Sequence, residues 1–94
     1  MVYPPVTTFC RSFLSSQNAS NPILVLHGML GSSQNWTQLG KVVQQRTNRS
    51  VHLLDARNHG KSPHSDDMTY FHLAADLRQF CRDQNITRAT FIGN

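Results

Sequence analysis

The most informative segment of this sequence is ILVLHGMLGS, residues 23–32. It begins with four consecutive apolar residues, which is the pattern of a strand covered on both faces. It continues with His27 and two glycines in a stretch that is typical of a loop. Glycine lets the backbone turn sharply and leaves amide hydrogens free to point into a site, where they can stabilise an oxyanion during acyl transfer. An ordinary glycine-containing turn is the competing interpretation.

Apolar segments of strand length alternate with helical patterns along the rest of the chain. The helical segments carry apolar residues at a 3.6-residue period: Trp36, Leu39, Val42 and Val43 in the first, and Leu73, Leu77, Phe80 and Cys81 in the second. Ser32 or Ser33 can cap the first helix, and Thr69 can cap the second. In chain order we expect a possible leading strand within 6–14, a strand at 23–26, a helix from 32 or 33 to about 46, a strand at 50–54, a helix from 69 to about 85, and a strand at 89–92.

This alternation predicts an α/β fold with about three parallel strands, two right-handed crossover helices and the possible leading strand. Ligands in such sheets gather beyond the carboxyl ends of the strands. The polar loops 27–33 and 55–62 both leave the sheet from those ends, and the strand at 89–92 points its end at the same region. A functional site is therefore expected there.

The second of these loops is DARNHGKS, residues 55–62. An acid two residues before an arginine can form a short ion pair, so Asp55 and Arg57 are expected to shape the loop, with Gly60 supplying a turn. This is an architectural interpretation, not a catalytic one. His59 is a possible proton carrier, but a lone loop histidine is more simply solvated. The same simple interpretation applies to the remaining candidates, His52, His64 and His72.

The composition excludes several classes of protein. The 94 residues have nine Lys and Arg against five acids, for a formal net charge of +4, yet the basic residues are scattered, so nucleic-acid binding is not expected. No apolar run approaches the roughly 20 residues that span a membrane. Cys10 and Cys81 form no disulfide framework and suggest a reducing, intracellular compartment. The histidine spacing predicts no metal site, and no targeting signal is visible at the N-terminus.

The chain resembles the N-terminal part of an α/β-hydrolase of the esterase and lipase branch. The matching segments are residues 23–32, Asn35-Trp36, DARNHGKSPHS at 55–65, MTY at 68–70 and Asp76-Leu77. The resemblance covers about residues 22–93. It implies an N-terminal strand and loop at 1–21, followed by a truncated α/β-hydrolase domain at 22–94 that ends just before the nucleophile elbow.

The resemblance also assigns site residues. It implies that the backbone N–H of Met29 contributes to an oxyanion hole, that His27, Gly28 and Leu30 bind substrate, and that Asp55, Arg57 and Gly60 form a structural loop; it implies no cofactor. Gly93 takes the first position of the family's G-H-S-M-G-G segment. Asn94 stands where the family has His, and the nucleophilic Ser would follow it.

The implied function is that of a fragment of a serine carboxylic-ester hydrolase acting on acylglycerol or other lipid esters. The 94 residues alone are expected to be inactive, because nucleophile, acid and base are absent. The alternative is a non-catalytic truncated isoform that binds a partner or the complementary fragment, or self-associates through an exposed sheet edge. Epoxide hydrolases and dehalogenases are a weaker alternative. The resemblance implies a mitochondrial location, with the cytoplasm as the other possibility.

Overall fold

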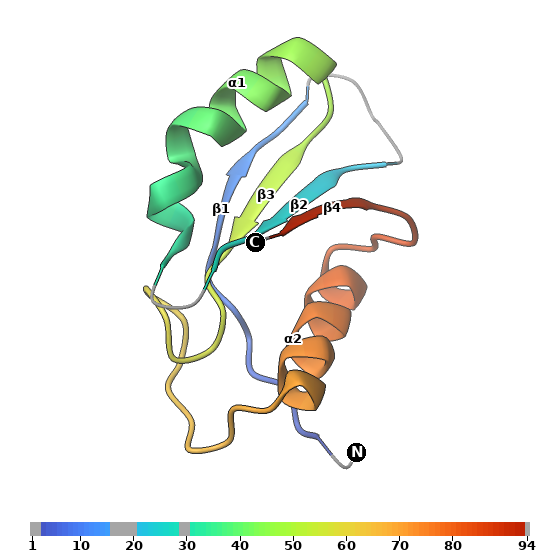
Figure 1. Cartoon of the computed structure of the whole chain (residues 1–94). Coiled ribbons are helices and arrows are strands. Elements are labelled where there is room, and N and C mark those ends of the chain that lie inside the picture. The colour runs from blue at the N-terminus through green and yellow to red at the C-terminus, as the bar shows by residue number, and fades with distance from the viewer. Residues whose placement is uncertain (1–2, 16–20, 29–30, 94) are drawn as a thin grey trace.

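The chain forms one four-stranded sheet with a helix on each face (Figure 1). The computed structural model describes residues 3–15, 21–28 and 31–93. The strands, in chain order, are β1 (Cys10–Phe13), β2 (Ile23–Leu26), β3 (Val51–Leu54) and β4 (Thr90–Gly93), and the helices are the short 3-10 helix η1 (Ser33–Trp36), α1 (Thr37–Thr47) and α2 (Tyr70–Asp83). Each expected element is therefore present, within a few residues of its predicted bounds.

The strand order is β1-β3-β2-β4. Strand β2 pairs in parallel with β3 on one side and with β4 on the other. The leading strand β1 pairs with β3 antiparallel, so the sheet is mixed at that edge. Both edges of β2 are thus used within the sheet, which explains why its sequence is apolar throughout.

Alternate side chains along the strands point to opposite faces and build two separate cores. The core under α1 consists of Ile23, Val25, Val51 and Leu53, with Phe13, Trp36, Val43 and Ile92 packed against it. The core under α2 consists of Leu24, Leu54 and Phe80, with Cys10, Leu26, Leu77, Cys81, Ile86 and Ala89 around it. The expected apolar stripe of α2 is confirmed by this second core.

The expected apolar face of α1 is partly wrong. Leu39 and Val42 are 48% and 45% exposed. The helix instead approaches the sheet through buried Gly40, where an added Cβ would lie 3.0 Å from a methyl carbon of Leu53. A glycine permits this close approach, and the rotation that it sets turns Leu39 and Val42 outward.

The cap expected at Thr69 is confirmed, and Ser32 caps the 3-10 helix η1 that leads into α1, whereas α1 itself has no side-chain cap. The Ser32 side chain accepts from the Gln34 N–H, and the Asn35 side chain accepts from the Ser32 N–H, which together form a capping box before η1. Thr69 caps α2 by accepting from the His72 N–H at 3.2 Å. None of the helices in the described part of the chain has the length and hydropathy that a membrane span requires.

Candidate functional site

The loops that follow β2 and β3 meet at the carboxyl end of the sheet. From β2 the chain crosses through α1 to β3 on one side, and from β3 it crosses through α2 to β4 on the other side of β2. This reversal of direction around a central strand opens a crevice at the strand ends, the usual place for a ligand in an open α/β sheet. The described parts of the two loops, residues 27–28 with 31–33 and residues 55–62, lie at that place, as expected from the sequence.

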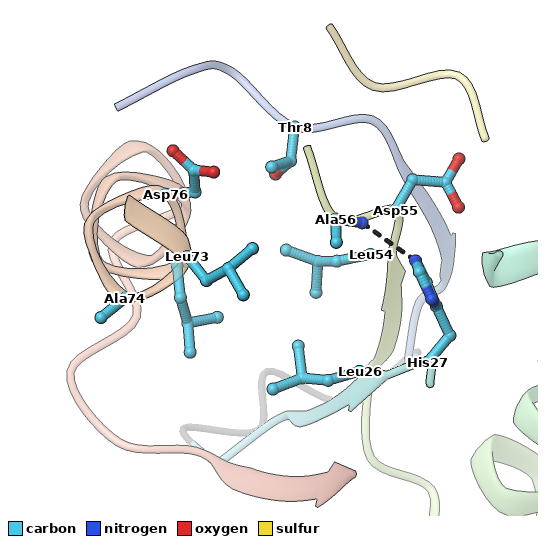
Figure 2. A pocket seen from close by; sticks show the side chains of 10 residues that line it. Thr8, Leu26, His27, Leu54, Asp55, Ala56, Leu73, Ala74 and Asp76 are labelled. Atoms are coloured by element: carbon cyan, nitrogen blue, oxygen red, sulfur yellow. Dashed lines mark hydrogen bonds between the residues drawn. The ribbon is translucent and has the colours of Figure 1, made fainter. Parts of the chain in front are cut away.

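His27 joins the two loops. Its Nε2 accepts from the Ala56 N–H at 3.0 Å (Figure 2). Its Nδ1 lies 2.8 Å from the Gly28 carbonyl oxygen. Because a backbone N–H can only donate, Nε2 is unprotonated, and Nδ1 carries the hydrogen that the Gly28 carbonyl accepts. The Gly28 carbonyl also accepts from the Gly31 N–H at 3.0 Å. The neutral imidazole therefore fixes the start of the first loop.

Asp55 is the second link between the loops. Its buried carboxylate accepts from the Ser33 N–H at 2.6 Å and from the Lys61 N–H at 2.9 Å. Burial acts to raise the pKa of Asp55, but the hydrogen bonds from Lys61 and Ser33 outweigh it and hold the pKa below its ordinary value. The carboxylate is thus kept ionised as a structural anchor.

Gly60 is required by this arrangement. Its φ is +51°, and an added Cβ would lie 2.3 Å from Oδ2 of Asp55. No side chain fits there without moving the carboxylate. The turn expected at Gly60 is therefore confirmed, with a specific steric reason.

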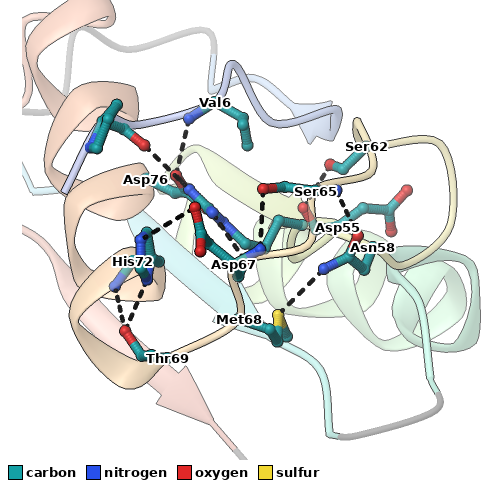
Figure 3. A network of polar contacts seen from close by, with 12 residues as sticks. Val6, Asp55, Asn58, Ser62, Ser65, Asp67, Met68, Thr69, His72 and Asp76 are labelled. Atoms are coloured by element: carbon teal, nitrogen blue, oxygen red, sulfur yellow. Dashed lines mark hydrogen bonds and ion pairs between the residues drawn. The ribbon is translucent and has the colours of Figure 1, made fainter.

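The expected short ion pair between Asp55 and Arg57 is wrong. Arg57 instead pairs with Asp76 of α2 through two parallel hydrogen bonds, Nε to Oδ2 at 2.8 Å and Nη2 to Oδ1 at 2.7 Å, and both side chains are buried. Asp76 also accepts from the Val6 N–H at 2.9 Å, as Figure 3 shows. The hydrogen bonds from Arg57 to Asp76 raise the pKa of the guanidinium. Arg57 thus anchors the loop to α2, and Asp55 anchors it to η1.

The histidines are less solvated than the sequence suggested. His59 lies 5.1 Å from His27 between ring centroids, and its Nδ1 is 2.9 Å from the Arg57 carbonyl oxygen. His52 is buried, bonded to Ser12 at 2.7 Å, and its burial lowers its pKa. His72 is buried beside Thr69. Only His64 is exposed as expected.

Two of the expected site residues, Met29 and Leu30, lie outside the described residues. The sequence did not predict the roles of two polar residues. Ser33, expected only as a helix cap, is a partner of Asp55, and Asp76, noted only as part of the resemblance, is the partner of Arg57. Ser33 receives a hydrogen bond from Nε of Arg11 at 3.0 Å while its N–H binds Asp55. Among the described residues, no group of three or more His, Cys, Asp or Glu side chains could hold a metal ion.

An apolar cavity of about 300 Å³ lies beside His27 and Ala56, between the strand ends and α2. Leu26, Leu54 and Leu73 project into it (Figure 2). Thr8 also lines the cavity, and its hydroxyl is buried without a hydrogen-bond partner among the described residues. The site thus combines a polar, hydrogen-bonded loop with an adjoining space for apolar groups.

Several known proteins are similar to this chain in sequence or in structure. The sn-1-specific diacylglycerol lipase ABHD11 of Danio rerio is 43% identical over 75 residues, which is 80% of this chain and 24% of the lipase. A probable alcohol acetyltransferase of Wickerhamomyces anomalus is 33% identical over 92 residues, which is 98% of this chain and 26% of that protein. Among solved structures, a marine microorganism esterase superposes with a TM-score of 0.82 at 37% identity, covering 95% of this chain and 32% of the esterase.

The chain therefore spans about a quarter of the length of the curated relatives that it matches first. The sequence profile described as "alpha/beta hydrolase fold" matches residues 21–94. The sheet order, the crossovers and the loops at the strand ends agree with this match. The chain is a partial domain that belongs to the alpha/beta hydrolase fold family.

Proposed function

We propose that this chain supplies the central sheet and the oxyanion loop of a serine carboxylic-ester hydrolase that acts on acylglycerols or other lipid esters. The observation that carries the proposal is the position of the His27-Gly28 loop at the end of central strand β2, fastened by His27 to Ala56 and, through Ser33, to Asp55. The names of the diacylglycerol lipase and the esterase among its relatives support the substrate class.

The chemistry follows from the loop. Attack of a serine hydroxyl on an ester carbonyl breaks the C=O π bond and places a negative charge on the oxygen, and fixed backbone N–H groups stabilise that charge. We propose the Met29 amide as one donor. Its support is the neighbouring carbonyl of Gly28, which two hydrogen bonds hold in place. His27, Gly28 and Leu30 are proposed to contact the substrate, and the apolar cavity suits hydrocarbon.

The 94 residues alone are proposed to have no turnover. The buried serines near the site are engaged in the structure: the Ser62 hydroxyl donates to the Asp55 carbonyl and accepts from the Phe9 N–H, and the Ser33 hydroxyl accepts from Arg11. Neither serine stands in a Gly-x-Ser-x-Gly context. We expect the purified chain to release no p-nitrophenol from an ester above the rate in buffer, and a burst of covalent acyl-enzyme would contradict this.

Reading the source transcript beyond the codon for Asn94 tests the hydrolase assignment itself. Gly93 begins the segment in which the family carries its nucleophile, so we expect a Ser in a Gly-x-Ser-x-Gly context to follow in frame in a transcript of the locus. The absence of such a Ser from every transcript would overturn the proposal. Cell fractionation that measures whether the longer product is found in mitochondria tests the mitochondrial location that the resemblance implies.

Acyl transfer to an alcohol is a close variant of the same chemistry. The relative called a probable alcohol acetyltransferase favours it, because an acyl-enzyme that water resolves in a hydrolase is resolved by an alcohol in a transferase. Adding ethanol to the esterase assay and quantifying ethyl ester against free acid separates the two activities.

A non-catalytic binding role is the second candidate function. Strand β4 ends the sheet, and its Phe91 side chain is 51% exposed. An open strand edge pairs readily with another strand, so β4 is proposed to bind the complementary fragment or a second copy. Light scattering that finds only monomer, together with no binding of the complementary fragment, would contradict this role.

A further inference from the structure

The outward face of α2 carries an unusual row of side chains. Phe71, Arg78 and Arg82 follow one another at spacings of seven and four residues, so they share one side of the helix. The buried Asp76 and Phe80 lie on the other side of the helix. A groove of about 240 Å³ runs along this face, lined by Tyr3, Phe71, Ala74, Ala75, Arg78, Gln79 and Arg82. We call this surface the α2 groove.

One end of the α2 groove is aromatic. Tyr3 stacks on Phe71 with ring centroids 5.1 Å apart and planes 17° apart, and Figure 1 shows the N-terminal segment beside the first turn of α2. Phe71 is nevertheless 65% exposed, and the adjoining Tyr70 is 87% exposed. Met68 is also among the exposed apolar residues. Large apolar side chains gathered in this way indicate an interaction surface.

The other end is cationic. Arg78 and Arg82 are exposed and one helical turn apart, where like charges repel each other and destabilise a helix. Neither takes part in an ion pair among the described residues, whereas Arg57 is paired with Asp76. Asp83, the acid next to Arg82 in sequence, accepts from Gln79 at 2.8 Å. The two guanidinium groups are therefore available to an external anion.

Between the two ends, Ala74 and Ala75 form a low floor. Small side chains here let the helix backbone approach a flat surface, while the longer side chains of Phe71 and the two arginines extend beyond them toward that surface. An amphipathic helix that lies in a membrane interface has the same parts: aromatic side chains enter the boundary between headgroups and acyl chains, and arginines reach the phosphates.

We propose that the α2 groove docks onto a bilayer surface containing anionic phospholipids, with α2 parallel to the membrane plane. Phe71, Tyr70 and Met68 enter the interface, and Arg78 and Arg82 bind lipid phosphates. A bilayer is favoured over an acidic peptide because the aromatic end is largely exposed, with Phe71 65% and Tyr70 87% accessible to solvent. The inference is independent of the proposed function, since lipid binding requires no ester hydrolysis.

Flotation of the 94-residue chain with vesicles tests the proposal. The vesicles contain phosphatidylcholine alone or phosphatidylcholine mixed with phosphatidylglycerol. We expect partition into the anionic vesicles, weakened by added salt. The double variant Arg78→Gln/Arg82→Gln should lower the partition coefficient roughly 30-fold, because each arginine near an anionic surface contributes about 1 kcal/mol. Phe71→Ser should lower it roughly 10-fold through the loss of apolar burial.

Matched controls lie on α1, on the other face of the sheet. Lys41→Gln/Arg46→Gln removes the same charge and should change partition by less than about 3-fold, because charges distant from the surface are screened. Leu39→Ser is the apolar control, since Leu39 is exposed on α1. Far-UV circular dichroism checks that the helix content of each variant is unchanged.

Three results would overturn the proposal. One is equal loss of partition in the α2 and α1 variants, which would mean non-specific attraction of a basic or unfolded chain. Another is equal partition into neutral and anionic vesicles. The third is binding of polyglutamate through Arg78 and Arg82 without binding to vesicles, which would assign the α2 groove to an acidic protein segment.

Discussion

The loop at 55–62 and the strand β4 differ in how completely neighbouring groups enclose them. In the loop, the Asp55 carboxylate fills the space beside Gly60, and Arg57 is held by Asp76. In β4, an added Cβ at Gly93 would meet nothing within 4 Å, and Phe91 is half exposed. The loop is thus completed by groups within the described residues, while β4 presents a free edge. Function that depends on precise geometry is expected at the first region, and association at the second.

The largest expected effect comes from breaking the buried pair that anchors the loop. Asp76→Ala leaves the Arg57 guanidinium buried without its carboxylate, which typically costs about 3–5 kcal/mol. We expect amide hydrogen exchange of β2 and β3 to lose most of its protection. The control Asp83→Ala removes an exposed acid and should change the free energy of unfolding by less than about 0.5 kcal/mol. Equal protection in the two variants would contradict the anchoring role.

A pair of glycine substitutions compares the two regions directly. Gly60→Ala places a methyl group against Asp55 at positive φ and should destabilise the chain by about 2 kcal/mol or more. Gly93→Ala enters open space and should stay within about 0.5 kcal/mol of the parent. Urea denaturation of both variants measures the difference. Similar values would mean that the loop is as open as β4.

Stability is expected to fall with decreasing pH in two steps. Burial lowers the pKa of His52, so below about pH 6.5 the unfolded chain binds more protons and stability is lost as pH falls through the folded pKa. The lowered pKa of Asp55 adds stability that is complete above about pH 4 and is lost as pH falls through its folded pKa.

Denaturation curves at several pH values measure these steps. His52→Gln should reduce the first step, and His64→Gln should leave it unchanged, because His64 is exposed. A first step that persists in full in His52→Gln would show that other groups carry it.

The smallest effect is expected in β4. Phe91→Lys places a charge on the exposed face of the edge strand, a common device against strand pairing. The free energy of unfolding should change by less than about 1 kcal/mol, while the weight-average mass from light scattering falls toward that of a monomer. An unchanged mass would argue that any self-association uses another surface.

The strands and their connections were predictable because their signal is local. The apolar run 23–26 coincides with β2, and Thr69 caps α2 as expected. The buried face of α1 was not predictable in full. Periodicity placed Leu39 and Val42 inward, but the helix comes closest to the sheet at Gly40. Periodicity records which residues are apolar and carries no information on where backbones come closest.

The partners of the polar residues were the least predictable part of the site. Spacing suggested Asp55 for Arg57, yet the actual partner, Asp76, is on another element. Asp55 instead accepts hydrogen bonds from the backbone N–H groups of Ser33 and Lys61. Long-range pairing depends on how the elements pack, which a single sequence does not state. The same limit explains why His52 and His72, interpreted as solvated, are buried.

The independent stability of the 94 residues is a further expectation. Ordering a chain of this length costs on the order of 100 kcal/mol of conformational entropy, and a sheet with one open edge buries a limited apolar area. We expect a broad, marginal thermal transition for the isolated chain. A sharp cooperative transition would contradict this.

A chimera tests directly whether the loop after β2, which begins at His27 and Gly28, is the oxyanion loop of an ester hydrolase. Residues 22–94 replace the matching segment of the marine microorganism esterase, which is 37% identical to this chain, and the acyl-enzyme burst with a p-nitrophenyl ester is recorded. We predict a burst, reduced about 100-fold or more in rate when Asp55→Ala releases the loop. A folded chimera with no burst, or one that Asp55→Ala leaves unchanged, would contradict the claim.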